Sequence, residues 1–138
     1  MADPSHVGRR YSAPGQVIDP ERAQAMAAAI GGAEGPAEPD VVPPTYAAVY
    51  CLAPAFAQVF TDPDIGINLA GLIHGEQSFE WPAPLRAGDT VDASAEIVGV
   101  EEKRGRTFVS ITVEAVRPLD GATVCRGRSL LIVQGGGQ

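Results

Sequence analysis

The chain has 138 residues, of which 45% are hydrophobic and 20% are charged, a composition typical of a globular protein with one domain. Its formal net charge of −7 argues against a nucleic-acid partner and against a polybasic membrane anchor. A chain of this length buries roughly two thirds of its unfolded surface, so its core needs no disulfide and no metal.

We expect a single domain over residues 1–138, with flexible tails at 1–6 and 135–138. Residues 1–10 contain no apolar stretch of the signal-peptide type, and no other segment resembles a membrane span. The expected location is therefore the cytoplasm. Cys51 and Cys125 fit no metal-ligand spacing, so we expect two buried free thiols, no metal and no cofactor.

The first elements expected along the chain are a short strand at 16–18 and a helix at 21–30. Asp19 is a good N-cap, Pro20 suits the first turn, and the alanine-rich run that follows favours a helix until two glycines end it.

Residues 43–60 form the central element that we predict, because they carry almost no charge and are apolar on all sides of a helix. Such a helix is usually buried. Pro44 suits its first turn, whereas Pro54 removes an internal hydrogen bond and predicts a kink after about two turns. Its length of about 25 Å is enough to cross a small domain.

After the central helix the hydrophobic period changes from 3.6 to two. This alternation predicts strands at 73–81, 91–100, 109–115 and 122–133, joined by tight turns that make neighbours antiparallel. The sheet has one apolar face to cover, and one apolar helix is available to cover it. The pattern predicts an α+β protein in which an antiparallel sheet is wrapped around one long central helix, the hot-dog fold.

Four segments resemble the N-terminal MaoC-like dehydratase family, which includes the non-catalytic subunit of (3R)-hydroxyacyl-ACP dehydratases. They are VGRRY at 7–11, VPPTY at 42–46, HGEQSFE at 74–80 and PLRAGDT at 84–90. The combination of the last two at this spacing is specific, whereas neither is so alone. The resemblance extends over residues 7–133. It implies a hot-dog fold, acyl-thioester substrates, and a functional pair of hot-dog units in which the second unit is catalytic.

The acid–base motif of this chemistry is missing. Hydration of an enoyl thioester needs an acid and a base on one water. The related R-specific hydratases supply them through an Asp-x-Asn-Pro-x-His motif, but the candidate segment here, DPDIGIN at 62–68, has no histidine five residues after either aspartate. The central helix also lacks an acid or base that works at neutral pH. This departure predicts a subunit that does not catalyse hydration alone.

His74 and Glu76 are the remaining catalytic candidates. They lie two residues apart, so a regular strand would place them on one face, where the carboxylate could polarise the imidazole. The alternative is a structural histidine near the subunit seam, which we favour. Glu76 either faces solvent or turns inward to pair with His74 or Arg86.

Three aromatic residues of the central helix, Tyr46, Tyr50 and Phe56, are candidates for an acyl-binding wall, because acyl chains need apolar surroundings. Plain core packing is the alternative and the more common role.

Two further chemistries have weaker support. Cys51 has no base near it in sequence to make it a thioesterase nucleophile. Arg126 and Arg128 lie on one face of the last strand and either meet a carrier or CoA phosphate or merely keep the strand soluble.

We therefore expect the substrate-accommodating subunit of a heteromeric (3R)-hydroxyacyl-thioester dehydratase or enoyl-thioester hydratase, in fatty-acid or related acyl metabolism. Its partners would be an acyl-ACP or acyl-CoA substrate and a catalytic MaoC-like subunit. Two alternatives stay open: a homodimeric hydratase or thioesterase that uses His74 and Glu76, and an acyl-CoA-binding module without chemistry.

Overall fold

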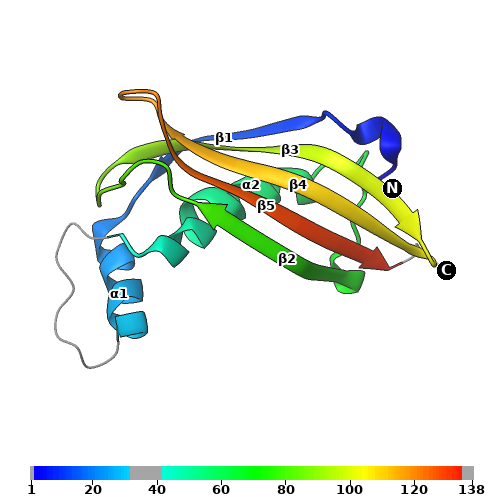
Figure 1. Cartoon of the computed structure of the whole chain (residues 1–138), viewed down its shortest axis with the longest axis horizontal. Helices are drawn as coiled ribbons and strands as arrows, with labels where there is room; N and C mark the ends of the chain where they lie inside the picture. Colours follow the sequence, from blue (N-terminus) through cyan, green and yellow to red (C-terminus); the bar gives the residue numbers. More distant parts are fainter. Residues whose placement is uncertain (1, 32–41, 135–138) are drawn as a thin grey trace.

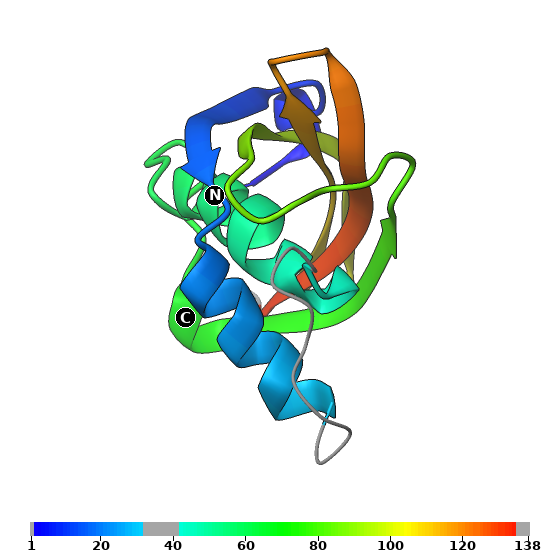
Figure 2. The same cartoon turned by 90° about the vertical axis from the view of Figure 1, so that its left-hand side faces the viewer.

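A computed structural model describes residues 2–31 and 42–134 and shows one antiparallel sheet of five strands. The strands are β1 (Arg10–Val17), β2 (Leu72–Glu80), β3 (Thr90–Lys103), β4 (Arg106–Arg117) and β5 (Ala122–Gln134). Their spatial order is β1-β3-β4-β5-β2, so β1 and β2 form the edges. The sheet curves around the central helical segment (Figures 1 and 2). This is the predicted hot-dog arrangement.

Alternation along the three inner strands creates the core. In β3, every second residue from Val91 to Ile97 is buried, and β4 repeats the pattern from Thr107 to Ala115. These side chains pack against the helical segment, while the residues between them face the outer side of the sheet. The strands predicted from a period of two are confirmed. β3, β4 and β5 extend beyond the predicted ranges, whereas β2 has the predicted length and lies one residue earlier.

The central segment is helical from Pro44 to Phe60, as predicted, but it is not one kinked α-helix. It consists of a 3-10 turn, η2 (Pro44–Tyr46), a π-helical turn, η3 (Ala48–Leu52), and a regular helix, α2 (Ala53–Phe60). Pro54 lies in the first turn of α2, directly after the π-helical turn, in which the Ala53 N–H donates to the Ala48 carbonyl. The helix type therefore changes immediately before the proline.

Helix α1 (Pro20–Gly31) begins as expected, because the Asp19 carboxylate accepts a hydrogen bond of 3.0 Å from the Glu21 N–H. Within residues 20–30 of this helix, only Ala23 is buried. The helix projects from one end of the sheet (Figure 2).

The short strand expected at 16–18 is wrong in extent, because β1 starts at Arg10 and ends at Val17. Its pairing with β3 is shifted between Ala13 and Gln16, and Gly15 at φ +73° lies inside the shift. Pro14 and Gly15 interrupt the alternation of inward and outward side chains, so the sequence alone did not indicate the full length of this strand.

The N-terminal residues form a 3-10 turn, η1 (Pro4–His6), capped by the side chain of Asp3. The tail expected at 135–138 lies outside the described residues. Among the residues that are described, no helix has both the length and the apolar character needed to cross a membrane.

Candidate functional site

The candidate site lies on the inner side of edge strand β2, where three polar side chains form a connected group. His74 Nε2 lies 3.0 Å from Gln77 Oε1, and the Ser129 hydroxyl of β5 donates to the same oxygen. Ser129 is 1% exposed. The Gln77 amide nitrogen donates to the Ser78 carbonyl at 2.9 Å, which fixes the amide orientation. With Gln77 Oε1 as the acceptor, His74 Nε2 is the donor in this contact.

The pairing of His74 with Glu76, the less favoured of the two interpretations of His74, is wrong because the two residues do not share a face of β2. The register between β2 and β5 shifts between these residues, since His74 faces Leu131 and Glu76 faces Leu130. This bulge at Gly75 inserts one residue, so His74 shares the inner face with Gln77 rather than with Glu76. Glu76 is exposed, as one of the two readings of this residue anticipated.

No ion pair joins His74 to a carboxylate within residues 2–31 and 42–134. Its imidazole instead packs on Phe56 of α2, with ring centroids 5.6 Å apart. An amide does not take up a proton at neutral pH, so Gln77 orients the imidazole without serving as an acid or a base.

Asp62, the acid nearest to a dehydratase motif in sequence, is bound elsewhere. Its carboxylate accepts hydrogen bonds from the Tyr11 hydroxyl at 2.7 Å and from the Arg9 guanidinium at 2.9 Å. These two donors lower the pKa of Asp62 to about 2. The aspartate therefore fastens β1 to the end of α2 and holds no proton to donate at neutral pH.

The aromatic side chains of the helical segment are buried together. Tyr46 and Tyr50 are each 3% exposed and their ring centroids are 6.2 Å apart, while Phe56 is 8% exposed and lies 5.3 Å from Phe60. The rings thus form the apolar layer between the helix and the sheet. Whether an acyl chain also contacts them stays a prediction.

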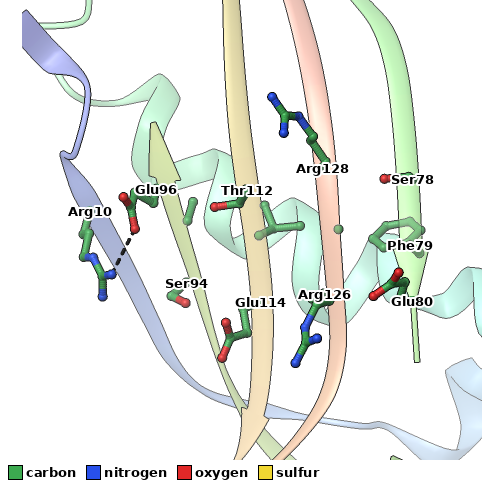
Figure 3. Close-up of a pocket in the computed structure, with 13 residues that line it drawn as sticks. Arg10, Ser78, Phe79, Glu80, Ser94, Glu96, Thr112, Glu114, Arg126 and Arg128 are labelled. Carbon is green, nitrogen blue, oxygen red and sulfur yellow. Dashed lines mark ion pairs between the residues drawn. The ribbon is translucent and has the colours of Figure 1, made fainter. Parts of the chain in front are cut away.

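Arg126 and Arg128 point outward together from β5, beside a hollow of about 610 Å³ on the outer face of the sheet (Figure 3). Opposite Arg126 on the adjacent strands are Glu114 and Glu80. A third arginine of this hollow, Arg10, forms an ion pair of 3.0 Å with Glu96. Three arginines and three glutamates line the hollow, so its formal charge balances. Phosphate binding here stays a prediction.

Sequence reasoning included Gln77 only as part of the HGEQSFE segment at 74–80, and it missed Ser129. A signal for Ser129 was present. Arg126 and Arg128 mark the outward face of β5, so the residue between Arg128 and Leu130 had to point inward. A hydroxyl on the inner face needs a partner, and the opposite strand supplies it.

Comparison with known proteins gives a consistent family assignment. Residues 7–126 match the family model described as "FAS1-like, dehydratase domain region". A UPF0336 protein of Saccharopolyspora erythraea is 27% identical, and the match covers 96% of this chain and 92% of that protein.

Two solved structures from Mycobacterium tuberculosis share the fold. The HadBC (3R)-hydroxyacyl-ACP dehydratase complex contains a chain with a TM-score of 0.72 and 21% identity, and the match covers 95% of this chain and 98% of that one. HtdX gives a TM-score of 0.74 at 21% identity, over 91% of this chain but only 51% of its own length.

Proposed function

Because this chain belongs to the FAS1-like dehydratase region family, we propose that it is the substrate-accommodating subunit of a heteromeric (3R)-hydroxyacyl-thioester dehydratase or enoyl-thioester hydratase. The acid and base would reside on a catalytic MaoC-like partner. The proposed setting is the cytoplasm and fatty-acid or related acyl metabolism. In this view residues 1–138 make up one hot-dog unit of a two-unit assembly.

The observation that carries the proposal is the partner of His74. The only other histidine, His6, lies in the N-terminal turn, so His74 is the one imidazole near the central helix. It is bound to the neutral amide of Gln77, and no carboxylate of the described residues forms an ion pair with it. A hydratase needs two proton-transferring groups around one water, and this arrangement offers at most one.

The open edge of β2 supports the assembly part of the proposal. One side of β2 pairs with β5, and no strand in the described part of the chain pairs with its other side. Unpaired N–H and C=O groups on an edge strand are a template for another strand. A second hot-dog unit would extend the sheet there. HadBC is a complex, and the HtdX chain is about twice as long as its match here, which is consistent with paired units.

The test is reconstitution with a partner. A protein from the same genome that carries the Asp-x-Asn-Pro-x-His motif is the first choice, above all if its gene is adjacent. We expect the two chains to co-purify and the complex to hydrate crotonyl-CoA. Replacing the partner's motif aspartate with Asn should abolish turnover, whereas His74→Ala in this chain should leave it largely intact.

The alternatives predict different outcomes. A homodimeric enzyme would turn over substrate alone and lose activity with His74→Ala. A binding module would bind acyl-CoA tightly without a partner and would add nothing to turnover by a catalytic chain. Either result would refute the subunit role.

Phe56 provides a test of the acyl wall formed by Tyr46, Tyr50 and Phe56. We expect Phe56→Leu to keep the fold at a cost of about 1 kcal/mol, because it roughly conserves apolar volume. If the ring contacts the acyl chain, the variant complex will change its preference between short and long enoyl-CoA substrates. Unchanged preference together with lowered stability would identify Phe56 as core only.

A further inference from the structure

The free edge of the sheet carries an outward row of three polar side chains. Beyond the bulge at Gly75, β2 alternates regularly, so Glu76, Ser78 and Glu80 point to the outer face. All three are exposed, and the two residues between them are less so. Figure 3 shows Ser78 and Glu80 on β2, next to the two arginines of β5. A strand that joined this edge would meet a carboxylate, a hydroxyl and a carboxylate in turn.

Positive charge compensates these carboxylates only from the β5 side. Glu80 lies opposite Arg126 of β5. Glu76 lies opposite Leu130, and Arg128 is only diagonal to it. Neither glutamate forms an ion pair in the described part of the chain. The negative column therefore lies at the open edge of the sheet, and the positive column lies one strand behind it.

Large apolar side chains are exposed at both ends of the same edge. Ile73, near the start of β2, is 47% exposed, and Trp81, directly after its end, is 45% exposed. Apolar and aromatic side chains beside an open strand edge are typical of an interface with another chain. These residues favour pairing with a second strand, and the charges between them determine which strand fits.

A second copy of the chain fits this edge poorly. Two antiparallel copies of β2 that overlap completely place Glu76 opposite its own copy, because it is the middle residue of Leu72–Glu80. Pairing of the regular part alone places Glu76 opposite the copy's Glu80. In the register between these two, Glu76 faces the copy's Ser78 and has a carboxylate diagonal to it on either side. Like charges are therefore neighbours in all three registers, which weakens each of them.

We propose that Glu76 and Glu80 make the β2 edge selective. It rejects a second copy of this chain and accepts a strand of another hot-dog unit that presents lysine or arginine opposite the two carboxylates. This inference rests on the proposed heteromeric assembly and adds the chemistry by which the partner is chosen. A cation opposite a glutamate forms a cross-strand pair with Cβ atoms about 4.5–5.5 Å apart. The net charge of −7 opposes self-association in the same direction.

The experiment uses the full chain and a charge-reversed copy of it, Glu76→Lys/Glu80→Lys, as a probe with a basic edge. Both replaced side chains are exposed, so the variant should fold, and circular dichroism checks this. In each register described above, its lysines lie opposite or diagonal to carboxylates of the wild type. We expect each protein alone to sediment as a monomer and an equimolar mixture to form a mixed dimer. Amide hydrogen exchange should then slow in β2.

A neutral variant provides a second measurement that does not depend on the charge-reversed one. Glu76→Gln/Glu80→Gln removes the repulsion, so its dimer dissociation constant should be about fivefold lower than that of the wild type. Glu101→Gln/Glu102→Gln is the matched control, because it removes the same charge from exposed positions of β3 and should leave self-association unchanged. At 1 M salt the Debye length is about 3 Å, so the mixed dimer should weaken.

The charge-reversed variant also tests the choice of the catalytic partner. Glu76→Lys/Glu80→Lys should lose co-purification with the catalytic chain, whereas Glu101→Lys/Glu102→Lys should keep it. Equal co-purification of the two variants would show that the partner does not recognise these carboxylates, and it would overturn the proposal.

Two other results would overturn it without any partner. The mixture could remain monomeric, in which case the glutamates only keep strands away from the edge. The wild type could dimerise as tightly as the neutral variant, with β2 protected in both. The subunit role fails separately, when a catalytic chain gains no turnover from the wild-type protein.

Discussion

Replacing Gly127 with Ala should displace edge strand β2, because no room exists for a methyl group at this position. A Cβ there would lie 2.6 Å from the Ser78 carbonyl oxygen, 2.9 Å from Phe79 Cδ1 and 3.0 Å from Gln77 Nε2. The nearest of these atoms is backbone, which cannot rotate away as a flexible side chain can. The edge strand has to shift outward and weaken the contacts that orient Gln77.

The expected cost is about 1–3 kcal/mol, the usual range for overpacking, which lowers the unfolding temperature by several degrees in a chain of this size. Gly99→Ala is the matched control. It also lies within a strand, but its Cβ would meet Ser110 Cβ at 3.6 Å and Ser110 Oγ at 3.7 Å, which is ordinary contact. Both changes restrict the unfolded chain equally, so the difference between the two variants isolates the steric effect.

Thermal unfolding followed by circular dichroism measures that difference, and amide hydrogen exchange locates it. We expect Gly127→Ala to unfold below Gly99→Ala and to lose protection first in β2. Equal unfolding temperatures and equal protection in β2 would refute the packing argument for this edge.

Two further predictions concern the polar contacts. The folded-state pKa of Asp62, about 2, lies below its ordinary value of 3.8. The contacts of its carboxylate with the Tyr11 hydroxyl and the Arg9 guanidinium therefore stabilise the chain fully above pH 3.8, and this stabilisation is lost as pH falls through about 2. Asp62→Asn should therefore flatten the dependence of the urea midpoint on pH in this window; a slope equal to that of the wild type would contradict the assignment. Gln77→Leu should lower the free energy of unfolding by about 1–3 kcal/mol, because it leaves the buried Ser129 hydroxyl without its acceptor. The double variant Gln77→Leu/Ser129→Ala should recover part of that free energy, as measured by urea unfolding. No recovery would show that the hydroxyl does not depend on Gln77.

Much of the fold could be predicted because alternation and helical period respond directly to burial. The runs around Val91 and Val109 alternate cleanly, and the structure buries the predicted faces. The all-apolar segment from Pro44 to Phe60 lies inside the curved sheet for the reason that its sequence indicates: it has no polar side to turn toward water.

The errors share one physical cause, the insertion of a single residue into a periodic element. A bulge reverses which side chains face inward, and a π-turn changes which residues of a helix face the core. The bulge at Gly75 separated His74 from Glu76, and the register shift between Ala13 and Gln16 concealed the extent of β1. Such insertions depend on packing between distant strands, so a local reading of β1 or β2 cannot locate them. The pairing of His74 with Glu76 assumed regular alternation along β2, and it is wrong because the bulge at Gly75 breaks that alternation.

The turnover of crotonyl-CoA by the purified chain alone tests the central claim most directly. The account predicts no hydration above the rate of a buffer blank, at protein concentrations where an addition of the catalytic partner gives ready turnover. Hydration by the isolated chain that disappears with His74→Ala would contradict it, because this chain would then carry its own proton-transferring group.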